Sequence, residues 1–314
     1  MHNFLTFAAI QNQVIHMENS KNNTLGYIYA LQAFFAWGIL PLFWKLLSNI
    51  PAMEVLAHRI FWSFVFLLLF ILIKKQRNII ALLKQKKTRN SLIVSSLLIG
   101  GNWGLFIYAV NINQIVEASL GYYINPIVNV LLGMIILKER LNTLKIVALI
   151  IASVSVIYLT IDYGRFPWIA IILALSFGFY GLVKKTAGIE AIPALTVETF
   201  ILAPLAAGFI FWKLFDHSGA LFSGDISTDA YLMLTGIVTT LPLYWFAKGA
   251  QRIPLSAIGF MQYIGPTLML LIGVFVYDEA FKKEQIIAFS LIWFALVLYT
   301  ISMIQGTRQK KEAN

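Results

Sequence analysis

Ionisable side chains inside apolar segments are the residues of this sequence best suited to chemistry. Glu198 has the apolar neighbours Val197, Phe200 and Ile201. Because a charge is costly in apolar surroundings, such a residue is by default a functional candidate. We interpret Glu198 as a group that binds a proton or a cationic ligand. The alternative is a buried partner for a Lys or Arg on another helix.

A second group of ionisable residues lies near the start of the apolar segment 54–73. Glu54 and His58 are four positions apart and share one helix face, whereas Arg59 points about 100° away. An imidazole titrates near neutral pH, so His58 is a candidate for proton coupling. Arg59 either binds an anionic substrate group or extends its cation towards the membrane interface.

Four charged residues near the ends of apolar segments form two pairs with the same spacing. Lys45 pairs with Lys185, and Glu139 pairs with Glu279. Interfacial anchoring is the favoured role for residues of this kind at such positions. Lys45 also joins the three residues above as a candidate for charge or proton coupling.

A polar stripe and two further polar clusters predict a binding site. Tyr122, Asn125 and Asn129 are spaced by three and four residues, so they lie on one helix face. Such a stripe faces either a substrate cavity or polar groups of a neighbouring helix. The candidate substrate-binding residues are Asn102, Trp103, Tyr108, Tyr122, Asn125, Asn129, Gln262 and Tyr263.

Two prolines in the middle of apolar segments predict helix breaks that act as gates. Pro126 and Pro266 each remove one backbone hydrogen bond and free a carbonyl four residues earlier, at Tyr122 and Gln262. A free carbonyl is tolerated in a membrane where it lines a water-filled cavity or meets a neighbouring helix. The alternative for either proline is a kink that serves packing alone.

No catalytic constellation emerges from the sequence. A phosphate-binding P-loop, an HExxH zinc motif and a GxSxG nucleophile elbow are all missing. The chain has no cysteine, which excludes disulfides, thiolate metal sites and cysteine nucleophiles. We therefore predict a protein that is not an enzyme and that uses no metal and no cofactor.

The elements that must position these residues are membrane-spanning helices. The chain is 59% hydrophobic and 12% charged, whereas soluble domains are roughly 45–50% apolar. Apolar stretches long enough to cross a bilayer recur through the sequence. The predicted helices are 25–48, 54–73, 91–110, 117–137, 143–161, 166–183, 192–213, 230–247, 254–277 and 285–304.

The basic residues predict the topology. The net charge is +10, but the Lys and Arg residues occur in short runs between apolar segments, which indicates topology rather than nucleic-acid binding. The loop 74–90 and the tail 305–314 are rich in Lys and Arg and lie on one side, together with the ends of alternate segments. By the positive-inside rule, both termini are cytoplasmic.

An internal repeat divides the chain into two halves. Tyr123, Pro126 and Gly133 match Tyr263, Pro266 and Gly273, and the residue numbers in each match differ by 140. The same spacing relates the Lys45 and Glu139 pairs described above. Since each half has five helices, an odd number, the halves cross the membrane in opposite senses. Inverted repeats are typical of secondary transporters with a central substrate site.

Long motifs resemble those of RarD-type permeases, in the EamA family of the drug/metabolite transporter superfamily. The resemblance extends from about Leu25 to Ile304, and the segments that show it are 35–45 (FAWGILPLFWK), 54–63 (EVLAHRIFWS), 99–103 (IGGNW), 117–133 (EASLGYYINPIVNVLLG) and 259–269 (GFMQYIGPTLM). It implies a ten-helix carrier of the bacterial inner membrane with two inverted repeats and a central cavity. Lys45, His58, Arg59, Asn102, Trp103, Glu117, Asn125, Glu198 and Tyr263 occupy motif positions.

The sequence thus predicts an all-α integral membrane protein that moves a small polar or amphipathic metabolite or drug by alternating access. Its partners are this substrate and the lipid bilayer. Two alternatives are a polytopic enzyme acting on a lipid-linked substrate and a membrane subunit that transports nothing.

The predicted organisation has four parts. Residues 1–24 are a disordered cytoplasmic extension, 25–161 and 162–304 are the two repeats, and 305–314 are a basic cytoplasmic tail. The polar stretch that follows Met17 suggests that residue as a second candidate for the natural start.

Overall fold

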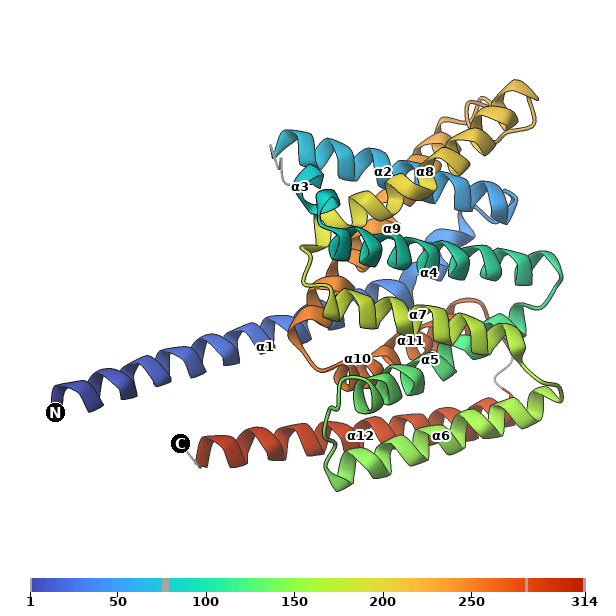
Figure 1. Ribbon diagram of the computed structural model, residues 1–314. Helices are drawn as coiled ribbons and strands as arrows, with labels where there is room; N and C mark the ends of the chain where they lie inside the picture. Colours follow the sequence, from blue (N-terminus) through green and yellow to red (C-terminus); the bar gives the residue numbers. More distant parts are fainter. Residues whose placement is uncertain (1, 75–78, 280–281, 313–314) are drawn as a thin grey trace.

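The protein is a bundle of helices (Figure 1). The computed structural model describes residues 2–74, 79–279 and 282–312, and for residues 2–21, 80 and 306–312 the backbone alone. The helices are α1 (His2–Lys45), α2 (Ala52–Ile73), α3 (Ile79–Lys84), α4 (Lys86–Asn111), α5 (Ile115–Ile135), α6 (Thr143–Tyr163), α7 (Trp168–Thr186), α8 (Ala191–Phe215), α9 (Ile226–Arg252), α10 (Leu255–Gln262), α11 (Ile264–Val276) and α12 (Lys283–Glu312).

Ten stretches of the described chain are long and apolar enough to cross a membrane. Each overlaps one of the ten predicted helices, and most ends differ by only a few residues. α3 is a short helix between two spans, while α10 and α11 together form the single span Leu255–Val276. These ten helical spans confirm the predicted all-α membrane fold. Helices suit a bilayer core because they satisfy their own backbone polar groups.

The two halves pack against each other with the symmetry of the repeat. α5 of the first half packs on α7 of the second, just as α11 packs on α1. Helices in equivalent positions also pair directly: α6 lies beside α12, and α2 lies beside α8 (Figure 1). The core is therefore shared by both halves rather than divided between them.

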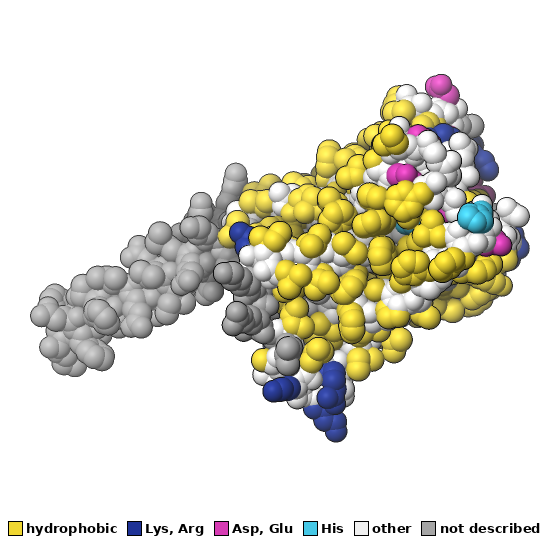
Figure 2. Space-filling view, turned by 90° about the horizontal axis from the view of Figure 1, so that it is seen from above, with side chains coloured by type: hydrophobic (Ala, Val, Ile, Leu, Met, Phe, Trp, Pro, Cys, Tyr) yellow, Lys and Arg dark blue, Asp and Glu magenta, His cyan; other side chains and the backbone are white. Residues whose placement is uncertain are grey.

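The bundle has two ends, which differ in what they hold. Both chain termini lie at one end (Figure 1). We call this end the terminal side, and the end that holds the α1–α2 loop (46–51) the opposite side. Hydrophobic side chains cover the middle of the face in Figure 2, while charged side chains gather towards its two ends. This distribution is the one expected of a protein surrounded by lipid.

Helix α1 begins earlier than the sequence predicts. Where the sequence predicts a disordered extension over residues 1–24, the structure has continuous helix from His2. No glycine or proline occurs before Gly26. Since these are the two residue types that most disfavour a helix interior, nothing local terminates the helix before the membrane span begins.

The two repeat-related prolines have different effects on their helices. α5 runs without a break through Pro126, so the break predicted there is not seen. In the second half the helix is interrupted at Tyr263, and Pro266 lies in the first turn of α11. The N–H groups of a helix's first turn have no acceptor within that helix. Pro266, which has no N–H, therefore loses no helical hydrogen bond there.

Candidate functional site

A cavity of about 650 Å³ lies between the two halves. Its lining comes from α1, α2, α4 and α5 of the first half and from α7, α9, α10 and α11 of the second. It extends from Phe34 and Leu243, near the middle of the bundle, to Leu47 and Ser48 in the α1–α2 loop. The cavity therefore reaches the opposite side of the bundle.

Eight of the residues singled out in the sequence line this cavity. They come from α1, α2, α4, α5, α10 and α11, which are distant in the chain and adjacent in the bundle. These residues are Lys45, Arg59, Asn102, Trp103, Tyr122, Asn125, Gln262 and Pro266. The structure thus brings together the basic residues Lys45 and Arg59 and two residues of the predicted polar stripe, Tyr122 and Asn125.

Amide hydrogen bonds hold the polar wall of the cavity in place. Asn102 Nδ2 donates to the carbonyl of Leu173 at 2.9 Å, and Asn125 Nδ2 donates to the carbonyl of Ala174 at 2.9 Å. Asn129 is fully buried behind the wall and donates to Asn125 Oδ1 at 3.0 Å and to Gln262 Oε1 at 2.7 Å. Asn129 therefore supports the lining without forming part of it.

Three other predicted site residues lie away from the cavity. Tyr263 is buried, and its hydroxyl donates to the carbonyl of Tyr123 at 3.3 Å, across the two repeats. His58 is 1% exposed, and its Nδ1 accepts a hydrogen bond from Trp62 Nε1 at 3.2 Å. Tyr108 is 49% exposed and is not part of the described lining.

Glu54 and His58, which share a helix face in the sequence, serve separate contacts. The carboxylate of Glu54 accepts a hydrogen bond from the backbone N–H of Ala220 at 2.6 Å, in the loop after α8. His58 instead contacts its own helix neighbour Trp62. Each of the two side chains therefore has its own hydrogen-bond partner, Glu54 in the loop after α8 and His58 within α2.

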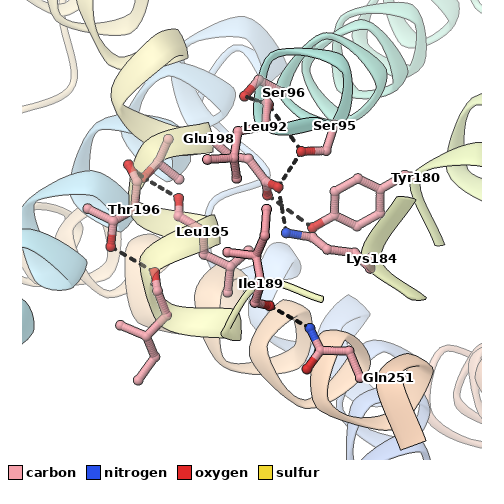
Figure 3. A network of polar contacts seen from close by, with 12 residues as sticks. Leu92, Ser95, Ser96, Tyr180, Lys184, Ile189, Leu195, Thr196, Glu198 and Gln251 are labelled. Atoms are coloured by element: carbon pink, nitrogen blue, oxygen red, sulfur yellow. Dashed lines mark hydrogen bonds and ion pairs between the residues drawn. The ribbon is translucent and has the colours of Figure 1, made fainter. Parts of the chain in front are cut away.

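Glu198 forms a buried ion pair, and neither partner belongs to the described cavity lining. Lys184 Nζ of α7 lies 2.5 Å from Glu198 Oε1 of α8, and both side chains are at most 4% exposed. Ser95 Oγ of α4 donates to the same oxygen at 2.5 Å, and the hydroxyl of Tyr180 donates to Oε2 at 3.3 Å. Figure 3 shows these four side chains converging from three helices. This arrangement matches the alternative given for Glu198 in the sequence analysis, a buried partner for a Lys or Arg on another helix.

Arg59 is the charged residue nearest the middle of the cavity. Its Nε donates to Thr239 Oγ1 at 3.0 Å, and Thr239 lies halfway along α9. The guanidinium carbon is 4.7 Å from the ring centre of Trp44 and 5.3 Å from that of Trp103. Snorkelling to the interface, the alternative for Arg59, does not match this position between two indoles.

Some cavity residues were missed in the sequence. Trp37 and Phe177 meet edge to face with ring centres 5.7 Å apart, and both line the cavity. Their numbers differ by the repeat spacing of 140, a signal that was available. Thr239 gave no such signal, because its repeat equivalent is the apolar Ile99.

Comparison with known proteins places the chain among bacterial membrane transporters. The sequence model of the EamA-like transporter family matches residues 24–161 and again residues 167–301. The chain is 45% identical to the uncharacterized transporter YojE of Bacillus subtilis over 300 residues, which cover 94% of this chain and 99% of that protein. It is 42% identical to the protein RarD of Salmonella typhimurium and 41% identical to that of Escherichia coli, over 93% of this chain in both cases and over 100% and 99% of those proteins.

A solved crystal structure shares the fold. It superimposes with a TM-score of 0.67 at 19% sequence identity and covers 90% of this chain and 98% of its own.

Proposed function

Since the chain belongs to the EamA-like transporter family, as a RarD-type permease, we propose that it is a secondary carrier that works by alternating access. The substrate is a small molecule bound in the cavity between the halves. We place the protein in the bacterial cytoplasmic membrane, with both termini in the cytoplasm. Repeat-related contacts that are made on one side of the bundle and broken on the other support this proposal.

On the terminal side, the two halves are joined by a carboxylate that caps a helix. Glu139, in the loop after α5, accepts hydrogen bonds from the backbone N–H groups of Leu255 at 2.7 Å and Ser256 at 2.9 Å. These are the first residues of α10, where N–H groups have no partner within the helix. A carboxylate is favoured at this position by hydrogen bonding and by the helix dipole.

A lysine closes the neighbouring helix end on the same side. Lys185 Nζ donates to the carbonyl of Ile253 at 2.7 Å and to that of Ala250 at 3.3 Å, at the C-terminus of α9. The capped residues Leu255 and Ser256 are 0% and 4% exposed. The terminal side is therefore closed by polar contacts around a buried helix junction.

On the opposite side, the equivalent loop has the same backbone but lacks the contact. Lys138 and Asp278 both have a positive φ, of 55° and 52°, and the N–H groups of Glu139 and Glu279 donate to equivalent carbonyls at 2.9 and 3.0 Å. Among the described residues, however, the carboxylate of Glu279 has no hydrogen-bond partner in the other half. This side chain is exposed.

The helix start that Glu279 would cap is also exposed. Ile115 and Val116, the repeat equivalents of Leu255 and Ser256, are 54% and 67% exposed. Lys45 lines the cavity with its ammonium 5.7 Å from the ring centre of Tyr277. Among the described contacts, it makes no hydrogen bond to the carbonyls of Val110 and Asn113, which correspond to those bound by Lys185. Two other carboxylates still bond across the halves on this side, since Glu117 and Glu54 accept from the backbone N–H groups of Ile169 and Ala220. The repeat-related contacts are not made among the described residues, and this difference between the two sides supports an open gate.

The repeat then defines the second state of the carrier. In that state Glu279 accepts from the N–H groups of Ile115 and Val116, and Lys45 donates to the carbonyls of Val110 and Asn113. The contacts of Glu139 and Lys185 are released, and the cavity opens to the terminal side. Exchanging one set of contacts for its symmetric copy keeps the energies of the two states close, as a carrier requires.

Neutralising the two repeat-related carboxylates is expected to shift the two states in opposite directions. Glu139→Gln weakens the closed terminal side, and Glu279→Gln weakens the state in which the opposite side is closed. A hydrogen bond to a charged group contributes about 1.5–3 kcal/mol, so each population ratio should change about 10- to 100-fold.

The chain has no cysteine, so spin labels can be attached to introduced pairs without background. We would introduce cysteines for labelling at the exposed positions Thr143 and Glu190 on the terminal side, or at Asn111 and Ser218 on the opposite side. Distance distributions between the two labels are then measured by double electron–electron resonance. The exposed Asp162→Asn is the matched control. Equal distributions in both variants, or a shift in the same direction, would contradict the proposed exchange of gates.

A further inference from the structure

The charges that line the cavity have one sign. Lys45 and Arg59 are the charged side chains of the described lining, and no Asp or Glu is among them. The ion pair found in the described part of the chain joins Lys184 to Glu198, so neither lining cation has a carboxylate within ion-pair distance there. A cationic substrate would meet repulsion in this cavity.

Arg59 is held in a fixed orientation and keeps donors free. Thr239 accepts from Nε, and Trp44 and Trp103 lie 4.7 and 5.3 Å from the guanidinium carbon. No described residue accepts a hydrogen bond from the two terminal nitrogens of the guanidinium. These nitrogens form the planar fork that binds a carboxylate through two parallel hydrogen bonds.

The position of Arg59 makes an anion the fitting partner. Thr239 fixes the guanidinium near the middle of the membrane span, where an unpaired charge is costly. Stacking on indole rings stabilises the cation in part. A bound carboxylate would neutralise it and satisfy its remaining N–H groups.

The remainder of the cavity suits an apolar, ring-shaped body. Phe34, Trp37, Phe106 and Phe177 line it, and Trp37 and Phe177 meet edge to face. Rings of this kind bind a flat apolar group through burial and offset or edge-on contacts. Gln262 adds a polar group to the lining. Because its Oε1 already accepts from Asn129, its Nε2 is the atom that can donate to a ligand.

We propose that the cavity binds an organic monoanion, a carboxylate attached to an aromatic or similarly flat apolar body. The carboxylate pairs with Arg59, and the body packs among the aromatic side chains. Lys45, at the end of α1, attracts the anion where the cavity meets the opposite side. This assignment rests on the proposed carrier function, since it names the substrate class of the same cavity.

The test uses three compounds that share an indole ring and differ in charge. Indole-3-acetate is an anion, indole-3-acetamide is neutral and tryptamine is a cation. Binding of each is measured by calorimetry on the full chain in lipid nanodiscs. We expect indole-3-acetate to bind about 10- to 100-fold more tightly than either of the others, which is the range for a charge-assisted hydrogen-bonded pair. Equal or tighter binding of tryptamine, or no binding of indole-3-acetate, would overturn the assignment.

Variants of Arg59 separate charge from shape. Arg59→Gln should remove the preference for the anion, and Arg59→Lys should keep part of it, because lysine retains the charge but not the fork. Arg89→Gln, at an exposed position in the first turn of α4, is the control and should bind like the unmodified protein. An anion preference that persists in Arg59→Gln would place the carboxylate elsewhere and overturn the proposal.

Flux measurements keep this proposal distinct from the carrier function. Counterflow of radiolabelled indole-3-acetate in proteoliposomes is compared with the spin-label distances above. Anion-selective binding without counterflow or state exchange would leave the substrate class standing and refute the carrier. Exchange of states with counterflow of tryptamine alone would leave the carrier standing and refute the substrate class.

Discussion

Replacing Glu198 by glutamine is expected to lower the free energy of unfolding by about 3–5 kcal/mol, the range for breaking a buried ion pair. The change leaves the ammonium of Lys184 at 4% exposure with no carboxylate beside it. Ser95 and Tyr180, which donate to the same carboxylate, also lose a charged acceptor. Because these residues belong to α4, α7 and α8, the loss affects contacts between three helices.

A second substitution tests whether the unpaired charge causes the loss. Glu198→Gln combined with Lys184→Met removes both charges, and it should recover most of the lost stability, since no unpaired charge is then buried. Unfolding in bicelles by denaturant titration gives the free energies. Glu190→Gln, at an exposed helix start whose side chain makes no capping bond, is the matched control. Recovery no better than the single variant would refute the ion-pair explanation.

The same double variant decides the role of Glu198 in transport. The sequence predicts proton coupling for this residue, whereas its partner Lys184 and its position away from the described lining favour a structural role. If the role is structural, the double variant keeps pH-dependent flux once it is folded. Loss of the pH response alone, with binding retained, would instead support proton coupling.

Replacing Gly236 by alanine is expected to destabilise the protein by about 2–3 kcal/mol, the upper part of the range for overpacking. A Cβ at this position of α9 would lie 2.4 Å from the carbonyl carbon of Trp62 and 2.7 Å from the backbone nitrogen of Ser63. Backbone atoms cannot rotate away, so α2 must shift. The hydrogen bond from Ser63 Oγ to the carbonyl of Gly236, at 3.1 Å, is strained by the same shift.

Gly208 provides the matched control for this substitution. It also lies within a helix, α8, and a Cβ there would meet no atom within 4 Å. Gly208→Ala should therefore be neutral or slightly stabilising, since alanine is the better helix former. The two variants are compared by the same unfolding titration, and an equal effect of both would show that helix propensity rather than close packing governs the response.

Local features of the sequence predicted the helices and their order. Membrane-spanning length and apolar composition are properties of contiguous residues, so the ten spans could be located without knowing what they contact. The repeat of 140 residues was equally visible, and it predicted the inverted halves from helix number alone. The polar stripe was also local: Tyr122 and Asn125 share a helix face because of their spacing.

The roles of single charged residues depended on tertiary contacts. Glu198 and Arg59 both occur among apolar residues, yet one is buried against Lys184 and the other lies against Thr239 in the cavity. Glu139 and Glu279 are likewise equivalent in the sequence, although, of these two carboxylates, only Glu139 accepts hydrogen bonds from the other half among the described residues. Sequence spacing sets which face of its own helix a side chain occupies, whereas its partner is set by which helices meet there and in which conformational state.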